Sequence, residues 1–279
     1  MDQTKRYGKR PHLLLTNDDG IFAPGLSTLW EALHAADFAD ISIVAPSCER
    51  SGTGVSITWD RPLHVQKEEW RETAAWSIDG SPADCVKLGT RLLLKERPDL
   101  VVSGINAGSN AGRNVLHSGT VGAVIEGLFR GIPGIAFSCE NGKNPNFHVA
   151  AKYVASLVEY VLENPQPEGT FLNVNFPDAA QDVVKGFRLT RQGRGRWSED
   201  PRLHRNHETG SSWWIGGKPE ELLDESPDCD IALLRQGFVT AVPIHVNELT
   251  DRKFFEEKAA SFEQYFSQRG CLKSDKAII

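Results

Sequence analysis

The chain has few cysteines, and their spacing argues against two common kinds of stabilised scaffold. Five cysteines occur among 279 residues, and no two of them form a CxxC pair. A disulfide framework or a zinc site usually requires an even or closely grouped set, which this odd and widely spaced set does not provide. We therefore expect reduced thiols and a cytoplasmic location.

The sequence also lacks a long apolar run and an excess of positive charge. A membrane-spanning helix needs about 20 consecutive apolar residues. The basic stretch MDQTKRYGKR is followed by Pro11 and His12 instead of the apolar core of a signal peptide. The formal net charge is −6, so we expect no binding to a nucleic-acid duplex or to a membrane. A small anionic ligand is still compatible, because a bound metal ion reverses the local field.

What the sequence does contain is an alternation of strand and helix patterns through about residue 176. Continuous apolar runs predict strands at residues 13–15, 41–46, 98–104, 134–138 and 171–176. Apolar residues at helical spacing predict helices at 25–36, 82–95, 119–131 and 147–163. This order predicts an α/β fold with a Rossmann-like, doubly wound, mainly parallel sheet and helices on both faces.

The character of the sequence changes near residue 186. The stretch RLTRQGRGRW contains four arginines, and Trp213 and Trp214 lie in the polar segment that follows. A basic surface loop and a projecting hairpin that contacts a neighbouring subunit are both compatible with this composition. Phenylalanines at helical spacing, with Ala259 among them, predict a helix over 252–268 that must dock on something.

We divide the chain accordingly into two parts of one domain. Residues 1–185 form the core with the functional site, and residues 186–279 form an extension. The extension is expected to contain the hairpin, a returning strand and the C-terminal helix, and to take part in the subunit interface of a homo-oligomer.

Two adjacent carboxylates, Asp18 and Asp19, end the first predicted strand in the stretch LLLTNDDG. Two such charges about 4 Å apart repel each other by roughly 4 kcal/mol at an effective dielectric constant of 20. A solvated turn would let the side chains diverge, since Asn, Asp and Gly all favour turns. The alternative is that a cation lies between them.

Polar, glycine-rich loops follow the first three predicted strands, at the edge where open parallel sheets bind ligands. These loops offer many oxygen atoms but no nearby pair of His or Cys side chains. Oxygen donors alone suit a hard cation, Mg²⁺ or Mn²⁺. Asp18 and Asp19 would supply the charge, and Ser51 and Asn106 would add neutral oxygens if the loops converge.

The segment GSNAGRNVLHSGT leads directly into the helix predicted from residue 119. Free N–H groups at such a terminus favour an anion, although ordinary capping by Ser118 is the alternative. We expect Asn106 and the N–H groups of Gly108 and of the 118–120 turn to orient a phosphate. The expected phosphate-binding or substrate-binding residues are Asn17, Gly52, Gly108, Asn110, Ser118, Gly119 and Thr120.

Four segments together resemble the SurE family of metal-dependent nucleotidases. They are NDDGIFAPGL, APSCERSG, GSPADCVKLG and SGINAGSNAGRNVLHSGTVGAVIEG, and the resemblance runs from Leu13 to about Ser138 with weaker matches at NVNFP and RLTRQG. It implies hydrolysis of nucleoside 5′- and 3′-monophosphates with one Mg²⁺ or Mn²⁺ ion per subunit. For some members it also implies cleavage of short polyphosphate. It further implies homodimers or homotetramers with swapped C-terminal elements.

Carried over by position, the family's metal ligands fall on Asp18, Asp19, Ser51 and Asn106, which the loop argument also selects. Gly54 replaces a frequent serine of the family, and Asn114 replaces a frequent acidic residue. Both departures bear on substrate preference. The catalytic candidates are Asp18 or Asp19 as the base that deprotonates water, and His117, more weakly, to assist the leaving group.

Three other functions compete with this interpretation. A Rossmann dehydrogenase would need G-x-G-x-x-G after the first strand, which NDDGIFAPG lacks. A haloacid-dehalogenase-type phosphatase would need a second aspartate two residues after the first, whereas Asp18 and Asp19 are adjacent. A nucleotide sensor without turnover would have the same pocket, and the sequence leaves it open.

Overall fold

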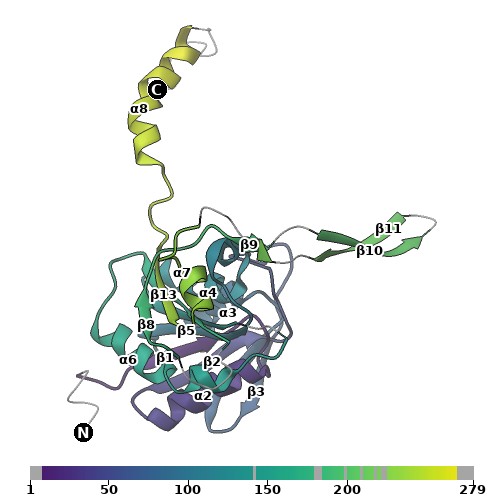
Figure 1. Cartoon of the computed structure of the whole chain (residues 1–279). Helices are drawn as coiled ribbons and strands as arrows, with labels where there is room; N and C mark the ends of the chain where they lie inside the picture. Colours follow the sequence, from purple (N-terminus) through teal and green to yellow (C-terminus); the bar gives the residue numbers. More distant parts are fainter. Residues whose placement is uncertain are drawn as a thin grey trace, which may run out of the picture. The chain divides into compact units, whose positions relative to one another are not determined.

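The computed structural model describes residues 8–140, 143–178, 184–197, 200–207, 210–216, 219–220 and 225–268. It divides into two compact units, Met1–His245 and Val246–Ile279. The first unit is built around one nine-stranded sheet (Figure 1). In spatial order its strands are β3 (Val65–Trp70), β4 (Thr73–Ile78), β2 (Asp40–Pro46), β1 (His12–Thr16), β5 (Leu100–Ala107), β6 (Gly134–Cys139), β7 (Thr170–Phe176), β13 (Val239–His245) and β8 (Phe187–Leu189).

The sheet is mainly parallel, as the sequence predicts. Six adjacent strands run parallel to one another: β4, β2, β1, β5, β6 and β7. β3 pairs antiparallel with β4, and β13 pairs antiparallel with β7. Chain order reverses on the two sides of β1, since β2 lies on one side and β5 on the other. That reversal creates the topological switch point at which doubly wound folds bind their ligands.

Helices cover both faces of the sheet, because successive strand residues point to opposite sides. Leu13 and Leu15 of β1 pack in one core cluster with the apolar side of α2 (Pro24–Ala36) and with α6 (Val154–Glu163). Leu14 faces the other side, where it approaches Gly89 at the end of α3 (Pro82–Leu88). α4 (Gly119–Leu128) packs beside α3 on that side.

Two predicted helices are interrupted in the structure. The predicted helix 82–95 is α3 followed by a π-helical turn, η1 (Gly89–Leu93). The predicted helix 147–163 is α5 (Phe147–Ala151) and α6, with a break at Lys152 and Tyr153. The sequence does not indicate the β3–β4 hairpin, since VQKEEW has too few apolar residues to predict a strand.

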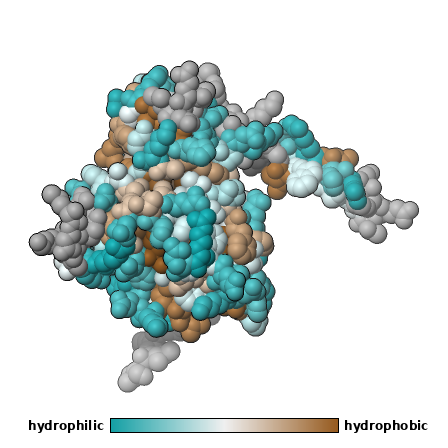
Figure 2. Space-filling view, turned by 90° about the horizontal axis from the view of Figure 1, so that it is seen from below, coloured by the Kyte–Doolittle hydropathy of each residue, from teal (hydrophilic) through white to brown (hydrophobic). Residues whose placement is uncertain are grey.

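The extension after residue 185 contributes to the same sheet and also forms the predicted hairpin. β8 and β13 close one edge of the sheet, and α7 (Asp230–Arg235) precedes β13. β10 (Asp200–His207) and β11 (Gly210–Gly216) form a separate antiparallel hairpin, whose base is the short pair β9 (Arg196–Trp197) and β12 (Pro219–Glu220). Trp213 and Trp214 lie exposed in β11, and Figure 2 shows apolar atoms on this hairpin at the right of the view.

The second unit contains α8 (Arg252–Gln268), which matches the predicted helix. Phe255 and Phe262 are exposed on it. Over the described ranges, no helix combines the length and the apolar character that crossing a membrane requires.

Candidate functional site

The loops after β1, β2 and β5 converge at the carboxyl edge of the sheet. The N–H of Arg50 donates to the carbonyl of Asp18 over 2.7 Å, which ties the β2 loop to the β1 loop. The N–H of Ala107 donates to Asp19 Oδ2 over 3.1 Å, which ties the end of β5 to the same loop. These two bonds bring the chain neighbours of Ser51 and Asn106 against the two aspartates.

Asp18 is buried against the N-terminus of α4. Thr120 Oγ1 donates to Asp18 Oδ1 over 2.5 Å, and the backbone of Thr120 also stabilises the carboxylate. Burial raises the pKa of Asp18 to about 6 in spite of these bonds. Gly119 permits the approach, since a Cβ there would lie 2.8 Å from Asp18 Cβ.

Asp19 is less buried and lines an open cleft. Burial raises its pKa, the hydrogen bond from Ala107 lowers it, and the charge of Glu49 raises it. Among the residues described, no Lys or Arg side chain forms an ion pair with Asp18 or Asp19. Two carboxylates at one edge without a basic partner are stabilised in their ionised form by a bound cation.

The neutral donors Ser51 and Asn106 have contacts that suit a cation. Ser51 Oγ donates its proton to Glu49 Oε1 over 3.0 Å, which leaves the lone pairs of the oxygen for another partner. Asn106 Nδ2 donates to the carbonyl of Gly108 over 2.7 Å, so Oδ1 is the atom left to coordinate a cation. No group of three His, Cys, Asp or Glu side chains suited to a metal occurs in the described part of the chain. A cation here would therefore depend on these neutral oxygens and on water.

The residues predicted to bind phosphate differ in which of their polar groups already make hydrogen bonds within the protein. Gly108 donates its N–H to the carbonyl of Cys139 over 2.9 Å, so this group already has a partner within the protein. Asn110 is buried and donates to Ser138 Oγ over 2.8 Å, which ties the loop after β5 to β6. Ser118 caps α4 by accepting from the N–H of Val121, the alternative that the sequence left open. Thr120 binds Asp18 as described above.

Three further predicted residues lie at the same edge. Asn17 Nδ2 donates to the carbonyl of Gly20 over 2.9 Å, while its buried Oδ1 has no partner. Gly52 has a φ of 78°, which favours glycine in the turn after Ser51. His117 is exposed, and its carbonyl accepts from the N–H of Gly54 over 3.0 Å. A catalytic role for His117 stays a prediction, and so do the phosphate contacts of Asn17, Gly52, Gly108, Asn110, Ser118, Gly119 and Thr120.

A clamp that the sequence does not predict joins the loop after β5 to the C-terminal extension. Asp230 is buried, and its two carboxylate oxygens accept from the N–H groups of Gly112 (2.9 Å) and Gly193 (2.7 Å). Asn114, a position that departs from the family pattern, accepts from the N–H of Trp197 over 3.0 Å. The arginine-rich stretch thus packs along η2 (Gly112–His117), the 3₁₀ helix that precedes α4. The sequence signal for this clamp is Asp230 itself, an acidic residue at the start of a short apolar run.

The cleft beside Asp19 has a volume of about 570 Å³. Its polar lining residues include Asp19, Glu49 and Ser51, and the lining also includes the free, exposed thiol of Cys48. Its apolar lining residues include Phe22. No Lys or Arg is among the lining residues that the structure describes.

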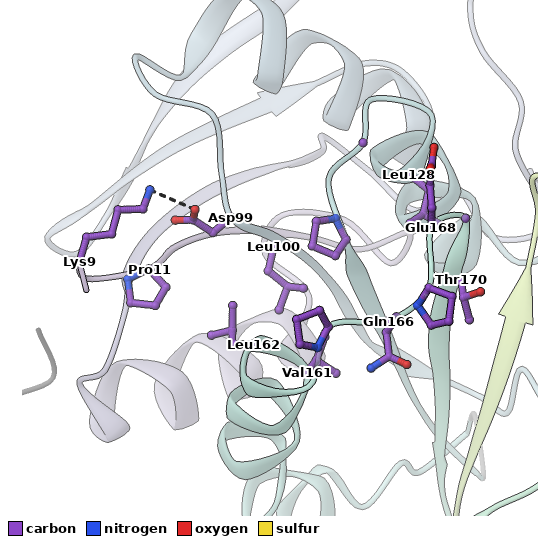
Figure 3. A pocket seen from close by; sticks show the side chains of 15 residues that line it. Lys9, Pro11, Asp99, Leu100, Leu128, Val161, Leu162, Gln166, Glu168 and Thr170 are labelled. Atoms are coloured by element: carbon purple, nitrogen blue, oxygen red, sulfur yellow. Dashed lines mark ion pairs between the residues drawn. The ribbon is translucent and has the colours of Figure 1, made fainter. Parts of the chain in front are cut away.

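A second hollow, of about 490 Å³, lies at the opposite edge of the sheet (Figure 3). Its wall is mostly apolar, with Leu100 and Leu162 among the labelled side chains, and the ion pair of Lys9 and Asp99 spans 3.0 Å at its border. It contains none of the predicted site residues. Ligands of doubly wound folds bind at the carboxyl ends of the strands, so we place the functional site at the cleft beside Asp19.

The chain is similar to known proteins over most of its length. The family model described as survival protein SurE matches residues 13–199. A protein of Protochlamydia amoebophila named 5′-nucleotidase SurE is 47% identical over 259 residues, which cover 92% of this chain and 98% of that protein. A protein of Pelotomaculum thermopropionicum with the same name is 41% identical over 246 residues, covering 88% and 92%. The crystal structure of the SurE protein from Aquifex aeolicus has a TM-score of 0.76 and 37% identity, covering 90% of this chain and 100% of that one.

Proposed function

The chain belongs to the SurE family, and from this premise we propose that it hydrolyses nucleoside 5′-monophosphates to a nucleoside and inorganic phosphate, using one divalent cation per subunit. Three relatives match this chain over almost their whole length, and all three share the name 5′-nucleotidase. A hydrolase of that class is therefore the activity that the family supports.

One observation supports the metal dependence most strongly. Asp18 and Asp19 both have a raised pKa because they are buried, and no basic side chain among the described residues pairs with either. Burial of two uncompensated carboxylates costs free energy that a dication removes. The all-oxygen donor set favours Mg²⁺ or Mn²⁺ over zinc.

Each residue of the site has a distinct part in this proposal. Asp18, fixed by Thr120, and Asp19, which faces the cleft, would hold the cation together with Ser51 Oγ and Asn106 Oδ1. When bound, a cation of this kind neutralises phosphate charge and lowers the pKa of a bound water. At the start of α4 the N–H of Gly119 would help to orient the substrate phosphate, since the N–H groups of Ser118 and Val121 donate within the protein.

The proton transfers are assigned as part of the same proposal. Asp19 is the more accessible of the two acids and lines the cleft, so it is the better placed to accept a proton from the attacking water. His117 would assist the departure of the leaving alkoxide from its exposed position at the end of η2.

Finer properties of the family extend the proposal. We include hydrolysis of nucleoside 3′-monophosphates and short polyphosphate, assembly as a homodimer or homotetramer, and a cytoplasmic location. The four cysteines in the described part of the chain are free thiols, in keeping with a reducing compartment.

Phosphate release from a nucleoside 5′-monophosphate tests the proposal directly. The purified chain should release phosphate with Mg²⁺ or Mn²⁺, lose that activity in EDTA, and regain it when the cation is restored. A nucleotide sensor would bind the nucleotide with the same cation and release no phosphate, so that result would contradict the assignment.

A further inference from the structure

The cleft beside Asp19 has an apolar wall that the metal chemistry does not use. Phe22, Pro24, Pro145 and Phe147 belong to this apolar part of the lining. Phe22 is 66% exposed although it follows Asp19 by only three residues. Its ring is therefore open to a ligand that enters the cleft.

The ring of Phe22 already packs against another ring of the protein. It stacks on Trp70, with ring centroids 6.0 Å apart and an interplanar angle of 17°. Trp70 ends β3 and is itself buried, so it gives the ring of Phe22 a well-packed neighbour. A rigid aromatic platform loses little conformational freedom when a second flat ring stacks on it.

Phe147 bounds the same cleft from the start of α5. A Cβ at Gly25 would come 3.1 Å from the ring of Phe147, so the backbone of α2 limits how far that ring can move inward. Among the described ring contacts, Phe22 stacks on Trp70 and not on Phe147. The two rings therefore line one cleft without closing it.

Charge and distance indicate which part of a ligand this wall suits. The lining contains Asp19 and Glu49 and no described Lys or Arg, so a phosphate gains nothing on the apolar side. Three residues span at most about 10 Å of chain. Phe22 is therefore close enough to the metal ligand Asp19 for one ribose to bridge a phosphate at the metal and a base at the ring. A neutral, flat group joined to the phosphate through a sugar fits both conditions.

We propose that the wall with Phe22 as its platform binds the nucleobase of the substrate, which rests on the proposed function. Stacking on a ring is available to every base, because each has a π-face. The platform therefore separates base-containing phosphates from sugar phosphates without a base, and it discriminates little among the bases themselves.

Steady-state kinetics of the full chain with adenosine 5′-monophosphate and with ribose 5-phosphate test the platform. Phe22→Ala should lower kcat/KM for the nucleotide about tenfold or more, mainly through KM. It should leave the ribose 5-phosphate value within about twofold, and Phe22→Tyr should restore the nucleotide value. Phe129→Ala is the matched control, because Phe129 is 61% exposed and lies outside the cleft lining.

Equal losses for both substrates in Phe22→Ala, or the same nucleotide kinetics as Phe129→Ala, would overturn the proposal. A change of oligomeric size in Phe22→Ala without a selective loss for the nucleotide would also overturn it, and would assign the ring to a subunit contact.

Adenosine binding, followed by ligand-observed NMR in EDTA, separates this inference from the proposed function. Adenosine should bind the wild-type chain and bind Phe22→Ala about tenfold or more weakly. If the wild type releases no phosphate but shows this difference, the hydrolase assignment fails and the platform stands. Equal adenosine binding by the two proteins contradicts the platform whatever the activity is.

Discussion

The carboxyl edge of the sheet and the C-terminal segments deviate from an ordinary globular protein in opposite ways. At the carboxyl edge, charged groups are buried: Asp18 is 3% exposed and has no basic partner among the described residues. In the hairpin and in α8, apolar groups are exposed, with Trp214 at 65% and Phe262 at 66%.

Both deviations cost free energy in an isolated chain, and each indicates what compensates for it. A buried carboxylate without a basic partner is stabilised by a cation. An exposed aromatic surface is stabilised by apolar contact, in this proposal with a second copy of the chain. The four predictions below test whether each region needs the partner that its chemistry indicates.

Removing a carboxylate at the carboxyl edge should have the largest effect. Asp19→Asn, and likewise Asp18→Asn, should reduce phosphate release at least a hundredfold, because each removes half of the charge that faces the cation. The fold should be intact, as circular dichroism would show, and Asp60→Asn serves as an exposed acidic control. Near-normal turnover of either variant at saturating Mg²⁺ would refute the metal assignment.

Removing α8 should abolish assembly and leave the sheet folded. The second unit, Val246–Ile279, contains α8, and none of the sheet strands lies in it. A chain that ends at Glu248 should therefore lose the dimer, since each aromatic ring buries on the order of 150–250 Å² when packed.

Light scattering at micromolar concentration compares the full chain with the truncated one. A dimer that becomes a monomer on truncation supports the subunit contact. A full chain that is already monomeric contradicts it, and a truncated chain that stays dimeric would assign the contact to the hairpin alone.

The pH dependence of stability should reveal the cost of burying Asp18. Burial raises the pKa of Asp18 to about 6 from an ordinary value of 3.8, so the folded state retains the proton longer than the unfolded state does. This contribution to the free energy of unfolding is fully present below the unfolded pKa and is lost as pH rises through 6. About two pKa units correspond to about 3 kcal/mol.

Urea denaturation in EDTA between about pH 4 and pH 7 measures this loss. Stability should fall with rising pH in the wild type and should fall less in Asp18→Asn. Saturating Mg²⁺ should reverse the trend, because the cation binds the ionised carboxylates. Parallel pH curves for the two proteins in EDTA would mean that Asp18 does not contribute the expected cost.

The sequence predicted those features that depend on residues close together in the chain. The mainly parallel sheet and α8 follow from apolar periodicity, and the carboxyl-edge loops follow from the polar residues after each strand. The Asp230 clamp joins residues 112, 193 and 230, and no local pattern indicates such a contact. The occupied N–H of Gly108 depends in the same way on Cys139, which lies on a neighbouring strand.

Removing the neutral oxygens at the carboxyl edge should have the smallest effect on the site, and their removal tests whether the loops converge on one cation. Ser51→Ala and Asn106→Ala each remove one uncharged donor, so Mn²⁺ affinity should fall by about tenfold while the two aspartates still bind. Ser47→Ala is the matched control, because Ser47 lines the same cleft but does not belong to the predicted ligand set. Titration of activity and of Mn²⁺ binding gives the affinities separately from turnover. Because Ser51 donates to Glu49, Glu49→Gln should weaken Mn²⁺ binding less than Ser51→Ala does. Equal, small effects of Ser51→Ala, Asn106→Ala and Ser47→Ala would mean that the cation depends on Asp18 and Asp19 alone, and that the loops after β2 and β5 only shape the cleft.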